Sequence, residues 1–256
     1  LGDSYTIGTS VSSDKAWPYQ LGNSLSEKGY DVEKVTIIAT TGWTTSDLKI
    51  AINSNNPGNE YNLVSLLIGV NNQYSGGSIE NYEREFEDLL KKAIRLAGNK
   101  NQVFVLSIPD YGYTPYGKSN QYEISQEIDE FNRVNSRITA KYNITYIEIT
   151  ELTRLGLQNL EYVASDGLHP SAIMYGLWVE KIMEQISLIP VNTQDLNKSN
   201  IDIRVAVKEK SIYFIHDPDL DLNNTTVQIY NITGKKVYEG KFENEIRLDF
   251  LDQGIY

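Results

Sequence analysis

The stretch Leu63-Val64-Ser65-Leu66-Leu67-Ile68, followed directly by Gly69-Val70-Asn71-Asn72, decides the fold class of this sequence. A short, almost continuous apolar run that ends at a glycine is typical of a parallel strand buried on both faces. Residues 103–108 form a second run of the same kind. Two such strands predict a parallel sheet covered by helices on each side, with polar residues such as Asn71 at its carboxyl edge.

Working outward, apolar β-branched runs alternate with helical patterns as far as about residue 190. The helical segments carry apolar residues at intervals of three and four, which predicts one buried face on each helix. The alternation predicts an α/β fold, a three-layer α/β/α sandwich with a parallel sheet. We expect strands at 32–39, 63–68, 103–108 and 144–149, and helices at 78–97, 124–142 and 171–189.

The pattern changes beyond Pro190, which is expected to close the last of these helices. Residues 191–202 are polar and rich in Asn, and we interpret them as a linker between domains 1–190 and 203–256. Only short β patterns follow, with a turn signal at 231–234. They predict a small all-β, sandwich-like domain with strands at 203–207, 211–215, 226–230, 236–239 and 245–250.

Composition excludes several classes of function. The 256 residues carry a formal net charge of −11, which disfavours binding to nucleic acid or to an anionic membrane surface. The chain has no cysteine, so disulfides and thiolate metal sites are excluded, and its two histidines disfavour a histidine-rich metal centre. We therefore expect no metal and no cofactor. No apolar run is long enough to span a membrane, and no signal peptide is visible.

The two ends indicate a piece of a longer chain. A turn begins at Gly2 with almost no strand before it, and the last residues, 253–256, resemble the start of a strand that is cut off. A signal peptide missing from such a piece is therefore uninformative.

Two segments carry the residue types that acyl transfer requires, namely a hydroxyl, a base and a carboxylate that orients the base. Ser4 follows Gly2-Asp3, where the first strand would end. His169 follows Asp166-Gly167, a tight-turn signal, and precedes Pro170, expected as the first residue of the next helix. Asp166 is then placed to reach His169 Nδ1. Taken singly, each segment is equally compatible with a plain turn, with Ser4 as a helix cap and His169 at the surface.

Four segments together resemble the sequence blocks of the SGNH (GDSL-type) hydrolases. Residues 1–8 (LGDSYTIG) resemble the first block, 41–45 (TGWTT) the second, 69–72 (GVNN) the third and 166–170 (DGLHP) the last. Their order and spacing agree with the family over residues 1 to about 189. One departure is Asn72, where the family commonly has Asp.

The resemblance implies a flavodoxin-like fold and a serine esterase. Ser4 would be the nucleophile, His169 its base and Asp166 the acid that orients the base. The N–H groups of Ser4 and Gly42 and the side-chain amide of Asn71 would form the oxyanion hole. Taken alone, Gly42 is a turn glycine and Asn71 a strand-end cap.

Aromatic residues near these blocks are candidate walls of a substrate pocket. Tyr111 and Tyr113 lie in a loop rich in Tyr, Gly and Pro that follows the predicted strand 103–108, and Trp43 adjoins Gly42. A rigid surface loop and a packing tryptophan are the alternatives. The acidic run 217–223 has oxygen-rich spacing, but it lacks the glycine and distal glutamate of the known helix-loop-helix calcium site, so a solvated loop is preferred.

Part of the β domain also resembles a known module. Residues 227–238 and 252–256 are similar to the C-terminal sorting domain of type-nine secretion substrates. This resemblance implies a bacterial protein, secreted or at the cell surface, with secretion machinery as a partner. The alternative is an immunoglobulin-like module that binds carbohydrate or acts as a spacer.

The sequence thus predicts hydrolysis of carboxylic esters through an acyl-enzyme on Ser4. Carbohydrate O-deacetylation or short-chain ester hydrolysis is favoured, and lysophospholipase activity is a further option. The hypothesis from another class is a non-catalytic protein that binds glycan or lipid on the same fold. The intact set of Ser4, Asp166 and His169 favours the enzyme.

Overall fold

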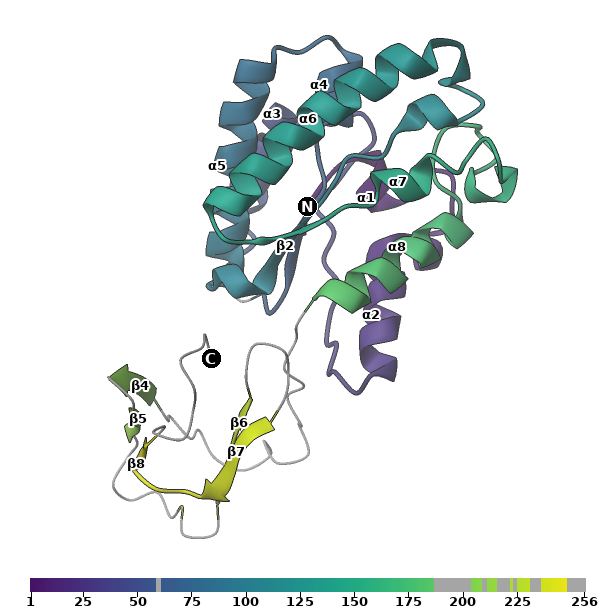
Figure 1. Cartoon of the computed structure of the whole chain (residues 1–256). Helices are drawn as coiled ribbons and strands as arrows, with labels where there is room; N and C mark the ends of the chain where they lie inside the picture. The colour runs from purple at the N-terminus through teal and green to yellow at the C-terminus, as the bar shows by residue number, and fades with distance from the viewer. Residues whose placement is uncertain are drawn as a thin grey trace. The chain divides into compact units, whose positions relative to one another are not determined.

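A computed structural model describes residues 1–58, 61–186, 204–208, 211–215, 222, 225–230 and 236–247 (Figure 1). The chain divides into two compact units, Leu1–Pro190 and Val191–Tyr256. All residues of the four sequence blocks lie in the first unit.

The first unit is built on a parallel sheet in which β2 (Val103–Leu106) lies between β1 (Val64–Leu66) and β3 (Thr145–Ile147). The sheet continues past β1, because Gly2 forms parallel bridges with Leu67 and with Ala39. In order along the chain, these five segments have the spatial order 2-1-3-4-5 of flavodoxin-like folds, whose ligands bind where the strand order reverses, beyond the carboxyl ends of the strands. That point lies between Gly2 and β1, so Ser4 and Asn71 both follow it.

Helices cover both faces of this sheet. On one face α2 (Trp17–Glu27) contacts α8 (Ala172–Gln185), and on the other α5 (Ile79–Ala97) contacts both α3 (Thr45–Asn55) and α6 (Gln121–Lys141), as Figure 1 shows. Right-handed crossovers separate α2 from α3, α5 and α6, because the chain crosses the sheet in one direction through α2 and in the other through those three helices, whereas α8 follows the last strand, β3, and packs beside α2. The three-layer α/β/α prediction is confirmed.

The remaining helical segments of the first unit are short, and several of them follow strands. They are α1 (Ser4–Ile7), α4 (Val70–Tyr74) and α7 (Thr150–Thr153), and the 3₁₀ turns η1 (Ser13–Lys15), η2 (Lys100–Gln102), η3 (Tyr111–Tyr113), η4 (Lys118–Asn120) and η5 (Leu160–Tyr162). Two of them, α1 and α4, begin directly at the sequence blocks that carry Ser4 and Asn71.

The core lies between the sheet and its helices, as the apolar periodicity predicts. All four residues of β2 are buried, and α5 buries Tyr82, Phe86, Leu89 and Leu90 completely or nearly so. Each fully buried side chain of this size stabilises the fold by about 1.5–3 kcal/mol. The carboxyl edge of the sheet therefore rests on a rigid scaffold.

Several predicted boundaries are wrong. Residues 32–39 form no regular strand, and only Ala39 makes a bridge, because its neighbour is the short segment that bridges at Gly2 alone. The helix predicted at 171–189 runs from Ala172 to Gln185. Pro170 is not its first residue: the Ser171 side chain caps the helix, and Pro170 pairs with Val163 outside it. Pro190 and the predicted linker lie outside the described residues.

The second unit contains two antiparallel sheets in its described residues. One has the order β4 (Arg204–Lys208), β5 (Ser211–Ile215), β8 (Glu245–Arg247), and the other pairs β6 (Thr226–Tyr230) with β7 (Lys236–Lys241). The five strands lie where the sequence predicts them, although β8 is described only to Arg247. The acidic run 217–221 and the segment 252–256 lie outside the described residues. None of the helices described in either unit combines the length and apolar character that a membrane crossing requires.

Candidate active site

Ser4 lies immediately beyond the carboxyl end of the sheet segment that contains Gly2, which lies between Ala39 and β1. It is the first residue of α1 and is only 5% exposed. The preceding Asp3 caps this helix, with its Oδ1 accepting a hydrogen bond from the Tyr5 N–H at 3.0 Å. Gly8 ends the helix in the left-handed region at φ 81°, where an added Cβ would lie 2.5 Å from Ala16 Cβ. A tight turn thus presents the serine, as a nucleophile requires.

The loop Asp166–His169 holds its histidine from both sides. Gly167 adopts φ 73°, and this turn lets Asp166 Oδ2 reach His169 Nδ1 at 2.6 Å. The backbone of the loop is fixed as well, because the His169 carbonyl accepts a hydrogen bond from the Ala164 N–H at 2.7 Å. A carboxylate at Nδ1 leaves Nε2 of the ring free to act as a base.

Four donors converge on the Asp166 carboxylate. Oδ1 accepts the N–H groups of Leu168 (2.9 Å) and His169 (3.0 Å), and Oδ2 accepts the Ser10 hydroxyl at 2.5 Å besides His169. Partial burial alone would raise the pKa of Asp166, but these hydrogen bonds, led by those from Ser10 and His169, hold it far below its usual value. Asp166 is therefore an anion throughout the neutral range.

The structure brings the serine segment next to the histidine. The ring of Tyr5, the residue after Ser4, meets the His169 ring edge-on with 5.7 Å between centroids. No direct hydrogen bond joins Ser4 Oγ to His169 in the structure. Such bonds are often long without substrate and shorten when it binds. The predicted bond between these two side chains stays a prediction.

Gly42 and Asn71 form a second side of the site, because they follow Ala39 and β1, the two segments that flank Gly2 in the sheet. Gly42 is exposed at φ 87°, and no atom lies within 4 Å of the place where a Cβ would be. Asn71, the second residue of α4, donates one Nδ2 hydrogen to the Trp43 carbonyl at 2.8 Å. Its second Nδ2 hydrogen has no partner among the described residues, so it can donate to a ligand.

Asn72 ties this second side together. Its Oδ1 accepts the Thr45 N–H at 3.0 Å, while its Nδ2 donates to Thr45 Oγ1 at 2.8 Å. Thr45 Oγ1 then donates to Glu85 Oε2 on α5 at 2.5 Å. The Asn72 amide thus accepts one hydrogen bond and donates another, and both anchor the loop that carries Gly42 and Trp43 to the helices beside it.

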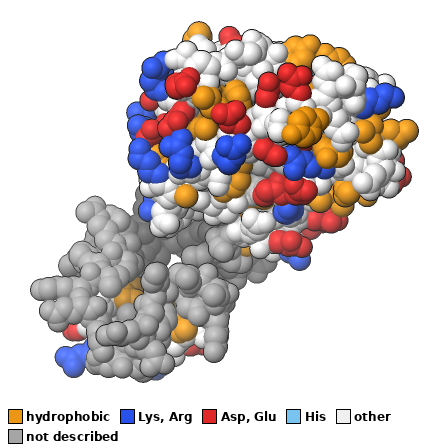
Figure 2. All heavy atoms as spheres, turned by 45° about the horizontal axis from the view of Figure 1, so that its top comes forward, with side chains coloured by type: hydrophobic (Ala, Val, Ile, Leu, Met, Phe, Trp, Pro, Cys, Tyr) orange, Lys and Arg blue, Asp and Glu red, His pale blue; other side chains and the backbone are white. Residues whose placement is uncertain are grey.

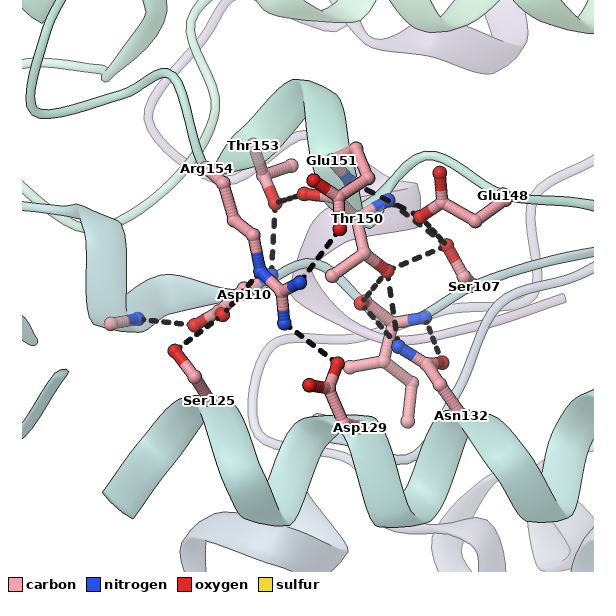
Figure 3. Close-up of polar contacts among 12 residues, drawn as sticks. Ser107, Asp110, Ser125, Asp129, Asn132, Glu148, Thr150, Glu151, Thr153 and Arg154 are labelled. Atoms are coloured by element: carbon pink, nitrogen blue, oxygen red, sulfur yellow. Dashed lines mark hydrogen bonds and ion pairs between the residues drawn. The ribbon is translucent and has the colours of Figure 1, made fainter. Parts of the chain in front are cut away.

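The loop with the predicted wall residues is fixed by a polar network (Figure 3). Asp110, fully buried, caps η3 and accepts hydrogen bonds from Ser125 (2.7 Å) and Arg154 (3.0 Å). Arg154 also pairs with Asp129 on α6 at 2.6 Å, and its guanidinium lies 6.0 Å from the centroid of the Tyr113 ring. The network supports a rigid loop at the carboxyl edges of β2 and β3.

The aromatic side chains of this region divide into buried and exposed ones. Tyr111 is 6% exposed, Tyr113 and Trp43 are half-buried, whereas Tyr74 and Tyr116 are 61% and 51% exposed. The hydroxyls of Tyr74 and Tyr116 are hydrogen-bonded at 2.7 Å, and the Tyr116 N–H donates to the Gly167 carbonyl at 2.9 Å. Tyr116 belongs to the aromatic loop that the sequence indicates as a candidate wall, although Tyr111 and Tyr113 were singled out there, and Tyr74, two positions after Asn72, was not predicted.

A small cavity lies beside the histidine. Its lining includes Tyr5, Tyr111, Leu168, His169 and Met174, and its volume is about 20 Å³. This holds about one water molecule.

The electrostatic surroundings give no sign of an inorganic ion. Within the described residues, no group of three or more His, Cys, Asp and Glu side chains gathers in a way that could hold a metal. On the face of the first unit that Figure 2 shows, acidic and basic side chains are interspersed with apolar ones and form no extended basic surface.

Comparison with known proteins identifies a family. The sequence profile of the GDSL-like Lipase/Acylhydrolase family matches residues 1–177. No curated protein sequence matched the chain.

Solved structures share the fold. The crystal structure of TesA is 22% identical with a TM-score of 0.58, and the match covers 72% of this chain and 93% of that one. The lipase/acylhydrolase from Enterococcus faecalis is 20% identical with a TM-score of 0.56, and the match covers 73% of this chain and 96% of that one. A catalytic mutant of the acetylxylan esterase Axe2 from Geobacillus stearothermophilus is 17% identical with a TM-score of 0.57, and the match covers 73% of this chain and 92% of that one.

The family profile covers more than half of the chain, and it spans Ser4, Gly42, Asn71, Asp166 and His169. This chain belongs to the GDSL-like lipase/acylhydrolase family and is a hydrolase that acts on esters.

Proposed function

We propose that the chain hydrolyses esters of short carboxylic acids through an acyl-enzyme on Ser4. The observation that carries this proposal is the 2.6 Å contact between Asp166 Oδ2 and His169 Nδ1, in a loop packed against the residue that follows Ser4. That arrangement fixes the tautomer in which Nε2 accepts a proton and stabilises the imidazolium that forms.

The reaction proceeds in two steps. Ser4 Oγ attacks the ester carbonyl while His169 accepts its proton, and the charge on the carbonyl oxygen is stabilised by the N–H groups of Ser4 and Gly42 and by the free hydrogen of Asn71 Nδ2. The bond to the alcohol breaks as His169 returns the proton to the leaving oxygen. Water, deprotonated by His169, then attacks the acyl carbonyl, and the bond to Ser4 Oγ breaks as His169 returns the proton to that oxygen, which releases the acid.

Two observations support a short acyl group on a sugar. The cavity beside His169 accommodates about one water molecule, which suits an acetyl group better than a long chain. The exposed rings of Tyr74 and Tyr116 flank the loop of His169 and the helix of Asn71, and such rings offer flat apolar faces with polar rims. Among the proteins of similar fold is an acetylxylan esterase.

A panel of esters tests this proposal. Nitrophenyl esters from acetyl to dodecanoyl, lysophospholipid and acetylated xylo-oligosaccharides would be compared, with Ser4→Ala as the blank. We expect kcat/KM to fall steadily beyond butyryl, and the acetylated sugar to be hydrolysed. Binding of glycan or lipid without any turnover by the wild-type chain would favour the non-catalytic hypothesis instead.

We further propose that the protein is exported by bacteria through its second unit. The support is the resemblance of residues 227–238 and 252–256 to a type-nine sorting domain, together with the antiparallel strands of this unit. Residues 191–256, fused to a fluorescent passenger in a host with that secretion system, should appear at the cell surface or in the medium. Retention of the passenger in the periplasm would contradict the proposal.

A further inference from the structure

The turn that follows α1 departs from the preference of its own sequence. Val11 N–H donates to the Gly8 carbonyl at 3.2 Å, which closes a four-residue turn with Thr9 and Ser10 at its centre. Ser10 adopts φ 70° at the third position, where a turn of this kind strongly prefers glycine or asparagine. A strained backbone at an ordinary serine indicates that its side chain is needed where it lies.

The two central side chains of this turn contact two different segments of the site. Ser10 Oγ donates to Asp166 Oδ2 at 2.5 Å, across 156 positions of sequence, and this is the oxygen that also contacts His169. Thr9 Oγ1 and Thr41 Oγ1 are hydrogen-bonded at 2.6 Å, and Thr41 immediately precedes Gly42. A single turn thus holds the acid on one side and the oxyanion loop on the other.

We propose that the turn Gly8–Val11 is a positioning clip, in which Ser10 orients Asp166, and through it His169, while Thr9 holds the backbone of Thr41 and Gly42. The short helix α1 joins Ser4 to the clip, so the clip sets the position of the nucleophile relative to Asp166 and to Gly42. Neither Thr9 nor Ser10 contacts the reacting atoms, so both are positioning residues. The inference rests on the proposed function for its catalytic consequence, although its geometric part stands without it.

The two arms of the clip have distinguishable effects. Ser10 and His169 both contact Asp166 Oδ2. Without the Ser10 hydroxyl, the carboxylate interacts more strongly with His169, which favours the imidazolium. The midpoint of the rise of kcat/KM with pH should then move upward. Thr9 lies on the side of Gly42, so its loss should lower kcat without moving that midpoint.

The groups that face this loop do not confuse the comparison. Tyr5 of α1 and Tyr175 of α8 are buried, which raises the pKa of both phenols, so they stay neutral. Asp3 titrates near pH 7, because burial raises its pKa to about 7. This titration is common to all variants, so differences between variants isolate the clip.

Ser10→Gly tests the first arm, because glycine suits φ 70° and the variant should be at least as stable as the wild type. With nitrophenyl acetate we expect kcat to fall about tenfold, as for loss of one hydrogen bond to an ionised group, and the pH midpoint to rise. Ser10→Asn, which tolerates this backbone and carries a donor, should recover part of kcat. Thr9→Val, of nearly the same shape, should lower kcat severalfold at an unchanged midpoint.

Ser26→Ala is the matched control, since Ser26 Oγ also donates one hydrogen bond, to the Gly22 carbonyl at 3.0 Å on α2. It should keep wild-type kinetics. Wild-type kcat and midpoint in Ser10→Gly would overturn the clip. If the wild type itself hydrolyses no ester, the proposed function fails, and the clip is then tested by an NMR titration of the His169 ring, assigned with a His216→Gln variant. An unmoved midpoint in Ser10→Gly overturns the clip, and a raised midpoint supports it.

Discussion

The two sides of the active site are built in different ways. The side that carries the base is contiguous in sequence: Asp166 contacts the backbone and the ring of His169 three residues later. The side that carries Gly42 and Asn71 is assembled from separate segments, through Asn71 to the Trp43 carbonyl, Asn72 to Thr45 and Thr45 to Glu85.

This difference determines what each side tolerates. The turn Asp166–His169 is held mainly by bonds among its own residues, with Ser10 and Tyr116 as partners from elsewhere in the chain, so a substitution there should change the chemistry and leave the fold intact. The second side depends on long-range hydrogen bonds between helices and a loop, so a substitution there changes chemistry and position together. Substitutions on the first side should therefore lower kcat with little loss of stability, whereas substitutions on the second side should lower both kcat and stability.

The largest expected effect lies on the local side. Asp166→Asn would place an amide against His169 Nδ1 and favour the wrong tautomer, so kcat should fall by about 10³–10⁴ with little change in KM. The melting temperature should change little, because the Asn side-chain oxygen can still accept the two backbone N–H groups. Steady-state kinetics and thermal melts measure both. A variant within tenfold of wild-type kcat would show that Asp166 does not orient the base.

The second prediction concerns Asn71. Asn71→Ala removes a donor to the oxyanion and should lower kcat by roughly a hundredfold or more while changing KM little. It also removes the bond to the Trp43 carbonyl, so the melting temperature should fall modestly, more than in Asp166→Asn. Thr139→Val serves as the control, since that hydroxyl bonds a carbonyl inside α6. Near-normal kcat in Asn71→Ala would remove Asn71 from the site.

The sequence was sufficient to predict the layers and the local side of the site. The apolar runs at β1 and β2 and the stripe of α5 are set by burial alone, and Asp166-Gly167 is a turn signal in itself. Residues 32–39 misled because a strand also needs a neighbour to pair with, and only Ala39 has one. The start of α8 was misplaced because Ser171, two positions past His169, caps the helix.

The second side could be named from the sequence only through resemblance. Nothing in the spacing of Asn72, Thr45 and Glu85 indicates that they meet, since the contact depends on how α3 packs on α5. The same holds for Ser10, whose strain is visible only as a backbone angle. Tyr74 was not predicted because its bond to the Tyr116 hydroxyl joins segments 42 positions apart, and no spacing in the sequence indicates that contact.

The third prediction asks how closely the long-range side is adjusted to an amide. In Asn72→Asp, the Thr45 hydroxyl has one hydrogen for two carboxylates, at positions 72 and 85, so these repel each other. We expect kcat to fall less than tenfold and the melting temperature to decrease as pH rises from 4 to 7. The double variant Asn72→Asp with Glu85→Gln should recover the stability at pH 7. Equal melting temperatures of Asn72→Asp and the wild type at pH 7 would contradict this account.

The smallest effect on activity is expected at Asp3, which lies on the serine segment between the two sides. Its carboxyl is 1% exposed, and burial raises its pKa to about 7 from 3.8, despite the hydrogen bond from the Tyr5 N–H. Between about pH 4 and 7 the folded chain therefore keeps a proton that the unfolded chain releases. The free energy of unfolding should fall as pH rises through this window and level off above pH 7, by about 4 kcal/mol at most.

Asp3→Asn removes this dependence, because asparagine matches the protonated carboxyl in shape and still accepts the Tyr5 N–H. At pH 8 the variant should melt several degrees higher than the wild type, and at pH 4 the two should coincide. Asp14→Asn, at an exposed carboxyl whose pKa is lowered by the Ser12 hydroxyl, is the control and should show no gain at pH 8. We expect kcat of Asp3→Asn to stay within threefold of the wild type, since Asp3 caps α1 and does not face the ester. Equal destabilisation of Asp3→Asn at both pH values would mean that the charged carboxylate supports the turn at Ser4. The serine segment would then depend on an ionised carboxylate, Asp3, as the histidine loop depends on Asp166.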